Sequence, residues 1–220
     1  TLLRMSEVIS EIFKGVYENI AVLSGPSHAE EVCRKMPTAV TSAALNLETA
    51  ERCRMLFMNE YFRVYNQNDI IGVETGSALK NVFAVASGIV DGLKYGDNTK
   101  AAIVSRGLKE LSRVGVALGG KEQTFYGLSG VGDLMVTCFS KHSRNRAVGQ
   151  AVGEGKILDE AEKSLGMVAE GIKNTISAYE IGKKLNIELP IINEMYAVLF
   201  NGKNPLKAVN DLMTRCPCHE

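Results

Sequence analysis

The feature that most constrains the fold is a long run of apolar and small residues between Thr75 and Val90. A polar pair, Lys80 and Asn81, interrupts this run, which is also too rich in small residues to span a bilayer. The sequence therefore predicts a helix buried in a globular domain, with no transmembrane segment. Its apolar residues recur at helical spacing: Leu79, Val82, Phe83, Ala86, Ile89, Val90 and Leu93.

Two interpretations of Lys80 remain open from the pattern alone. A lysine on an apolar helix usually lies at its edge and extends its ammonium into water. An ammonium partly withdrawn from water can instead transfer protons, and Asn81 beside it could orient a ligand. The second interpretation is favoured by small residues on the same face, which are expected to line a cleft: Gly76, Ser77, Ala84, Ser87 and Gly88.

Two kinds of segment follow one another along the chain. Before residue 68 apolar strands alternate with helices, which is typical of a parallel or mixed α/β sheet. Beyond it we expect helices alone, so the predicted parts are residues 1–68 (α/β) and 69–220 (all-α). In the first part we expect helices at 5–13, 27–34 and 47–58 and strands at 20–25, 37–45 and 61–65. The predicted later helices include 133–139, 144–152, 158–165, 168–185, 191–200 and 206–214.

Two glycine-containing turns precede predicted helices. In SGPSHAEEV, Ser27 and Glu30 form a potential capping box, and the free N–H groups of the helix start could also bind an anion. In GLSGVGDLM no strand comes first and Met135 takes the place of a third glycine, so it is no dinucleotide fingerprint. Asp133 in this turn is either an N-cap or a carboxylate that holds a substrate hydroxyl or a nearby lysine.

Basic residues gather in the segment SKHSRNRAVG. Ser143 is a predicted N-cap, and the surrounding cations are Lys141, His142, Arg144 and Arg146. Cations at a helix start can bind phosphate or carboxylate, and this interpretation is favoured over a solvated basic turn. We expect His142 to be a surface residue rather than a catalyst.

The charge balance excludes one class of protein. The chain has 25 basic and 25 acidic residues, so it lacks the excess of positive charge of a nucleic-acid binder. Its five cysteines show no framework spacing, and Cys216, Cys218 and His219 near the C-terminus would need a further ligand from elsewhere to bind a metal. We therefore expect a reduced, cytoplasmic protein without a metal site.

Several blocks, taken in order, resemble the bacterial type of the NAD(P)-dependent glycerol-3-phosphate dehydrogenase family: LSGPSHAEEV, GVETGSALKNVFAVASGIVDGL, GLSGVGDLMVTC, SRNRAVG and VAEG. The resemblance covers essentially the whole chain. It implies that residues 1–68 are the last part of a Rossmann-type dinucleotide-binding domain and that 69–220 form a multi-helical substrate-binding domain. The implied reaction is reversible hydride transfer between NAD(P)H and dihydroxyacetone phosphate. Its product, sn-glycerol 3-phosphate, feeds glycerophospholipid synthesis; a homodimer is a further expectation.

The resemblance also assigns roles to residues. Lys80 is implied as the catalytic proton acceptor in glycerol phosphate oxidation, with Asp133 as its partner, and Thr137 is a weaker candidate for the substrate phosphate. The implied substrate-binding residues are Gly25, Ser27, Lys80, Asp133, Ser143, Arg144 and Asn145. The implied contacts with NAD or NADP are Ala29, Arg144, Val168 and Glu170.

One part of the family pattern has no counterpart in the sequence. The G-x-G-x-x-G turn, the residue that reads the adenosine ribose and a further substrate lysine would lie upstream of Thr1. This chain alone is therefore expected to be inactive. An alternative is that it is a truncated fragment that acts only as a helical dimerisation or substrate module.

Overall fold

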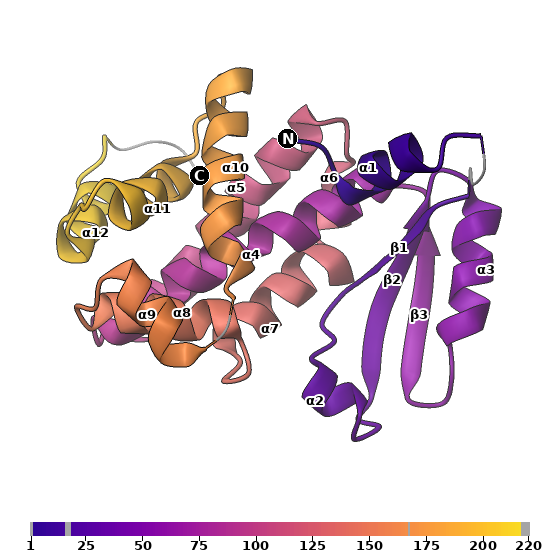
Figure 1. Cartoon of the computed structure of the whole chain (residues 1–220), viewed down its shortest axis with the longest axis horizontal. Coiled ribbons are helices and arrows are strands. Elements are labelled where there is room, and N and C mark those ends of the chain that lie inside the picture. Colours follow the sequence, from indigo (N-terminus) through magenta and orange to yellow (C-terminus); the bar gives the residue numbers. More distant parts are fainter. Residues whose placement is uncertain (1, 16–18, 167, 217–220) are drawn as a thin grey trace.

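The computed structural model describes residues 2–15, 19–166 and 168–216. Figure 1 shows three strands with their helices at one end of the molecule and a helical assembly at the other, joined by the long helix α4. The first part contains α1 (Met5–Ile12), β1 (Ala21–Ser24), α2 (Ala29–Val32), β2 (Thr38–Ala44), α3 (Leu47–Phe57) and β3 (Phe62–Gln67). The helical part contains α4 (Ile70–Gly92), α5 (Asp97–Ala117), α6 (Glu122–Phe125), the π-helix η1 (Leu128–Gly132), α7 (Asp133–Phe139), α8 (Arg144–Gly153), α9 (Leu158–Leu165), α10 (Glu170–Leu185), α11 (Pro190–Phe200) and α12 (Pro205–Met213).

The sheet is mixed, as the sequence predicted. Strand β2 lies in the centre, antiparallel to β1 and parallel to β3. The side chain of Ser42 on β2 is buried and donates a hydrogen bond to the carbonyl of Ala50 at 3.0 Å, which fixes α3 against the sheet. The apolar side chains at the end of α3 are not buried, since Leu56 is 82% and Phe57 50% exposed.

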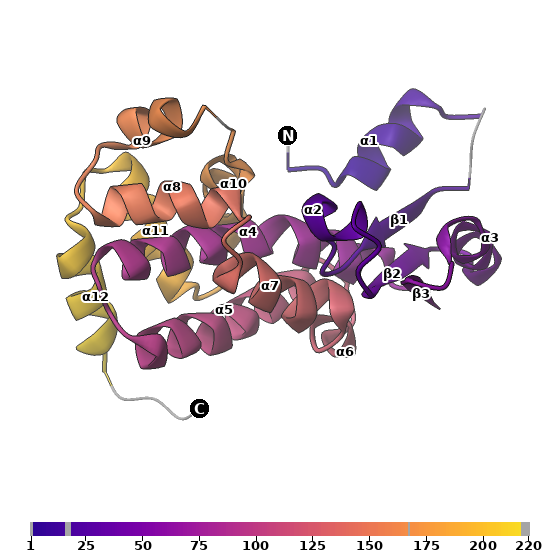
Figure 2. The same ribbon diagram turned by 90° about the horizontal axis from the view of Figure 1, so that it is seen from below.

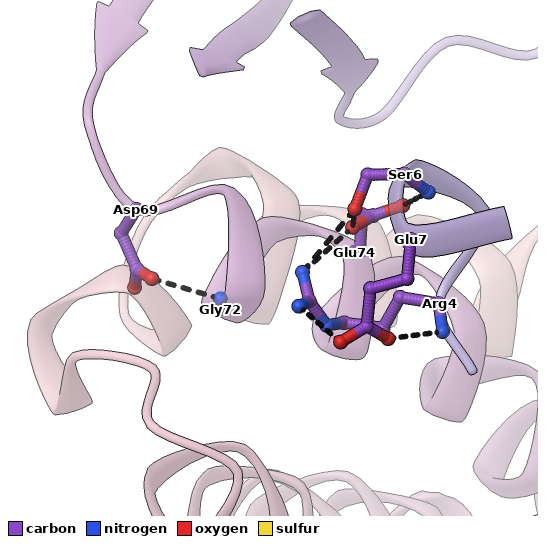
Figure 3. Close-up of polar contacts among 6 residues, drawn as sticks. All are labelled: Arg4, Ser6, Glu7, Asp69, Gly72 and Glu74. Atoms are coloured by element: carbon purple, nitrogen blue, oxygen red, sulfur yellow. Dashed lines mark hydrogen bonds and ion pairs between the residues drawn. The ribbon is translucent and has the colours of Figure 1, made fainter. Parts of the chain in front are cut away.

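Helix α4 forms the centre of the helical part, and most of its residues are buried. Asp69 caps it: one carboxylate oxygen accepts from the N–H of Gly72 at 2.9 Å (Figure 3). The other oxygen accepts from the backbone N–H of Lys121 at 2.8 Å and the hydroxyl of Thr124 at 2.6 Å. A buried carboxylate with three donors thus fixes both the start of α4 and the turn before α6.

Helix α1 is held to α4 by Glu74. One oxygen of this carboxylate accepts the backbone N–H of Ser6 at 2.8 Å, and the other accepts from the hydroxyl of Ser6 and from Arg4 (Figure 3). Arg4 also pairs with Glu7 at 2.8 Å. A charged network of this kind links residues 68–70 positions apart in sequence, so α1 and α4 stay together.

Helix α8 packs closely along α4, and Figure 2 shows the two side by side. Their backbones approach through glycines: a Cβ at Gly88 would lie less than 3.0 Å from the carbonyl of Arg146, and one at Gly149 equally close to that of Val85. Any larger residue would force the helices apart. The start of α8 is therefore held at a fixed place beside α4.

Most helix positions agree with the sequence predictions, and α7 and α9 agree at both ends. The capping box is wrong, because His28 precedes the short helix α2 and the hydroxyl of Ser27 donates instead to the carbonyl of Gly25 at 3.0 Å. The N-cap of helix α5 is Gly96. Helix α6 and η1 were not predicted. Among the described residues, no helix is long and apolar enough to cross a membrane.

Candidate active site

A cleft of about 180 Å³ lies where the β1–α2 loop meets the helical part. Pockets for drug-sized ligands occupy roughly 300–1,000 Å³, so this cleft suits a small molecule rather than a dinucleotide. Loop, turn and helix residues from both parts of the chain form its walls. They are Gly25, Ser27, His28, Lys80, Asn81, Asp133, Val136, Thr137, His142, Ser143, Arg144, Asn145 and Glu170.

The centre of the cleft is an ion pair between Lys80 on α4 and Asp133 at the start of α7. The Lys80 side chain is 15% exposed and that of Asp133 5%, so both are largely withdrawn from water. Burial raises the pKa of Asp133, while the charge and hydrogen bond of Lys80, a hydrogen bond from Thr137 and the charge of His28 act in the opposite direction. A largely buried ammonium held by one carboxylate is suited to proton transfer with a ligand.

The structure decides between the two interpretations of Asp133. The N-cap of α7 is Gly132, and the Asp133 side chain is directed to Lys80, so the capping interpretation is wrong. Thr137, one turn later, donates its hydroxyl to the carbonyl of Asp133 at 2.5 Å. This contact anchors Thr137 beside the pair and makes it a further wall of the cleft.

The small residues on the Lys80 face of α4 do not line this cleft, which corrects the sequence interpretation. Gly88 packs against the backbone of α8, and Gly76 against the carbonyl of Ser129 in η1. Ser87 is fully buried and donates to the carbonyl of Cys138 on α7 at 2.9 Å. These residues let neighbouring helices approach α4, and only Lys80 and Asn81 of the helix reach the cleft.

Two asparagines fix the far wall. The side-chain N–H of Asn145 on α8 donates to Asn81 on α4 at 3.0 Å, and its carbonyl oxygen accepts the backbone N–H of Gly171 on α10 at 2.8 Å. Because three helices meet at this amide, Asn145 is held in one orientation. The wall is thus polar and rigid.

The N-terminus of α8 supplies a place for an anion. Ser143 is the N-cap, as predicted, and accepts the backbone N–H of Arg146 at 3.3 Å. Arg144 is about half exposed at the mouth of the cleft, where its guanidinium lies 3.4 Å from Glu170. Free N–H groups and a guanidinium at a helix start favour a negatively charged ligand.

Two of the four cations predicted at the anion site, Arg146 and Lys141, do not line the cleft. Arg146 turns away and donates to Asp91 at 2.6 Å, in an ion-pair cluster with Lys100. Lys141 is exposed and is not among the residues that line the cleft. His142 is exposed, as expected, but it does line the cleft.

The other predicted site residues divide into two groups. Ala29 is an exposed residue of α2 and Val168 is 62% exposed before α10; neither lines the cleft. Sequence reasoning missed His28, although it directly follows Ser27 in the same loop. The predicted residues that do line the cleft are Gly25, Ser27, Lys80, Asp133, Thr137, Ser143, Arg144, Asn145 and Glu170.

The described residues do not by themselves form a cradle for a dinucleotide. Such a cradle needs a strand, a glycine-rich turn and a helix in succession. The glycine-rich segment at Gly127–Gly132 instead follows helix α6 and winds into a π-helix. No group of three potential metal ligands occurs in the part of the chain that the structure describes.

Comparison with known proteins identifies the family. Residues 69–210 match the model for the NAD-dependent glycerol-3-phosphate dehydrogenase C-terminus, and residues 1–50 match that for the N-terminus. The chain is 55% identical over 215 residues to glycerol-3-phosphate dehydrogenase (NAD(P)+) of Fusobacterium nucleatum, covering 98% of this chain and 64% of that protein. The Thermoanaerobacter sp. protein of the same name is 54% identical, with 100% and 66% covered.

A solved structure agrees with these sequence matches. Glycerol-3-phosphate dehydrogenase from Coxiella burnetii superposes with a TM-score of 0.92 at 39% identity, over 97% of this chain and 65% of that one. This chain thus spans a little under two thirds of the length of the relatives that it matches. On this evidence the chain belongs to the NAD-dependent glycerol-3-phosphate dehydrogenase family of oxidoreductases.

Proposed function

We propose that the protein reversibly reduces dihydroxyacetone phosphate to sn-glycerol 3-phosphate with NADH or NADPH. The observation that carries this proposal is the Lys80–Asp133 pair inside a small cleft whose opposite wall is the start of α8. The relatives from Fusobacterium and Thermoanaerobacter are named for this dehydrogenase activity, which supports the same assignment.

The phosphate of the substrate would bind at the start of α8. Ser143, Arg144 and the free N–H groups of the first helical turn offer hydrogen bonds and positive charge there. Gly25 and Ser27 form the facing loop, so a three-carbon phosphate would extend from α8 toward Lys80. The volume of about 180 Å³ suits a ligand of this size.

Lys80 would handle the proton. In the reducing direction the substrate carbonyl becomes an alcohol, and its oxygen takes a proton from the ammonium of Lys80, which becomes a neutral amine. In the oxidising direction the amine accepts the proton of the hydroxyl, and the carboxylate of Asp133 stabilises the ammonium that forms. The nicotinamide cofactor supplies or takes up the hydride when it is bound. Because the described residues form no dinucleotide cradle, we assign no hydride step to them.

The remaining parts of the proposal concern the whole protein. Arg144 and Glu170 at the mouth of the cleft, with Ala29 and Val168, would lie on the cofactor side. Residues 1–68 would be the last part of the dinucleotide-binding domain and 69–220 the substrate-binding domain. We further propose that the protein acts in the cytoplasm, supplies a precursor of glycerophospholipids and can form a homodimer.

Calorimetric titration with sn-glycerol 3-phosphate tests the proposal directly. We expect the chain to bind sn-glycerol 3-phosphate but not glycerol, because the phosphate supplies most of the contacts at α8. Arg144→Ala should weaken binding about tenfold, the scale of one charge-assisted hydrogen bond. Lys173→Ala, an exposed lysine on α10, is the matched control.

Turnover is measured separately as oxidation of NADH by dihydroxyacetone phosphate. Binding together with turnover supports the whole proposal. Binding without turnover would make the chain a substrate-binding module of the dehydrogenase, which is the alternative expected from its sequence. Absence of binding in the wild type would refute the assignment of the cleft.

A further inference from the structure

The fixed charges of the cleft cancel before any ligand enters. The ammonium of Lys80 is paired with Asp133, and the guanidinium of Arg144 lies 3.4 Å from Glu170. A phosphate dianion would add two negative charges that no remaining lysine or arginine of the cleft lining balances. The two histidines in the lining are the groups that could supply positive charge, because imidazole titrates near neutral pH.

His28 lines the cleft and carries a buried ring nitrogen. It lies in the β1–α2 loop between Ser27 and Ala29, and its Nε2 atom is buried without a hydrogen-bond partner among the described residues. Polar atoms that are buried nearly always have a partner, so one that lacks it in a ligand cleft points to the ligand. Its hydrogen bond is available to a phosphate oxygen.

The second histidine lies close to the first. The ring of His142 is tilted by 58° to that of His28, with 6.0 Å between their centroids. His142 lines the cleft and directly precedes Ser143, the N-cap of α8, where the phosphate would bind. The two histidines therefore come from separate segments of the chain and lie together in the lining of one cleft.

Other charged groups surround the pair. The pKa of Glu30 is lowered by a backbone hydrogen bond, against the effect of burial, and lowered further by the charges of His142, His28 and Arg144. His28 also acts on Asp133, as described above. The charged groups near the two histidines are thus Glu30 on α2 and the charged residues that share the cleft lining: Lys80 on α4, Asp133 on α7, Arg144 on α8 and Glu170 on α10.

We propose that His28 and His142 form a proton-dependent phosphate clamp, in which Nε2 of His28 donates to the substrate phosphate and the pair gains positive charge as the dianion binds. This inference rests on the proposed function, since it takes a three-carbon phosphate as the ligand. It makes both histidines substrate-positioning residues, distinct from the proton-transfer pair Lys80–Asp133. Binding then takes up protons at any pH at which the histidines are neutral in the unliganded protein. Below about pH 6 the phosphate itself becomes protonated and the attraction weakens.

Calorimetry of sn-glycerol 3-phosphate binding in two buffers of different ionisation enthalpy measures the proton uptake. At about pH 7.5, near the imidazole range, we expect the wild type to take up a fraction of a proton. His28→Gln keeps a hydrogen-bond donor at a similar position but cannot be protonated. His142→Gln makes the same change at the exposed histidine. Each variant should take up fewer protons and bind about tenfold more weakly, and the double variant should take up none.

The pH dependence separates charge from folding. At about pH 9 imidazole is neutral, so the wild type and both glutamine variants should bind with similar affinity. A variant that had merely misfolded would bind weakly at both pH values. Glutamine variants that keep wild-type affinity and proton uptake at about pH 7.5 would overturn the clamp while leaving the proposed function standing. If the wild type itself binds no sn-glycerol 3-phosphate at either pH, both the proposed function and the clamp are refuted.

Discussion

Glu110 on α5 provides a test of the energetics of the helical part. Its side chain is buried, and its two oxygens accept the backbone N–H groups of Ile191 at 2.7 Å and Ile192 at 3.1 Å. It therefore caps the start of α11 from another helix. Burial raises the pKa of Glu110 from 4.5 to about 7, although the two N–H donors and the charges of Arg113 and Arg215 act to lower it.

The sign of the effect follows from proton linkage. Because the pKa of Glu110 is higher in the folded chain than in the unfolded one, the folded state binds the proton more tightly between pH 4.5 and about pH 7. The contribution of Glu110 to the free energy of unfolding is thus fully present below pH 4.5 and is lost as the pH rises through about 7. Between about pH 5 and about pH 8 the linkage amounts to about 2.5 kcal/mol.

Glu110→Gln removes this titration while leaving one carbonyl oxygen to accept from α11. The lost second acceptor should destabilise the variant by about 1–3 kcal/mol at about pH 5. At about pH 8 the buried carboxylate of Glu110 is charged, which lowers the stability of the wild type. The difference in free energy of unfolding between the two proteins should therefore shift by about 2.5 kcal/mol in favour of the variant. Urea unfolding of both proteins at the two pH values measures this shift. An equal difference at both pH values would refute the argument.

Three further changes have defined outcomes. Lys80→Ala should lower turnover of the catalytically competent protein roughly 10²–10⁴-fold with an unchanged circular dichroism spectrum, and a rate above about a tenth of wild type would contradict the proton-transfer role. Gly149→Ala should destabilise the chain by about 1–3 kcal/mol, because its Cβ would collide with the carbonyl of Val85, whereas Gly96→Ala, with open space around it, serves as the control. Glu74→Gln should speed amide hydrogen exchange in α1 and leave α4 protected; unchanged exchange in α1 would show that apolar contacts alone hold it.

The sequence predicted several helices closely. Helix α4 was predicted over most of its length, because its apolar residues recur at helical spacing over several turns, and the short helices α7 and α9 were predicted at both ends. The prediction of a capping box at α2 was wrong for a local reason. The hydroxyl of Ser27 donates to the carbonyl of Gly25, and His28 takes the N-cap position. A serine can hydrogen-bond to several nearby backbone groups, and the sequence alone does not show which of these groups it will bind.

Contacts between distant segments were harder to predict. The pair of Lys80 and Asp133 joins residues 53 positions apart, and the resemblance to the family suggested it before the structure placed it. No pattern within the chain indicated that Arg146 would turn to Asp91, whereas Arg144, two residues earlier, faces the cleft. Side chains two residues apart on a helix point in directions about 200° apart, so Arg144 and Arg146 lie in different surroundings.

The position of Lys80 on a mostly buried helix follows from the packing of α4 rather than from the cleft alone. Gly88 and Gly149 bring the backbones of α4 and α8 together, which places the start of α8, with Ser143 and Arg144, across from Lys80. The same close packing excludes water from most of the helix, and Asp133 supplies the partner of the largely buried Lys80 side chain. The glycines therefore act on the candidate site at a distance, because they set how far the start of α8, the proposed phosphate site, lies from Lys80, the proposed proton donor.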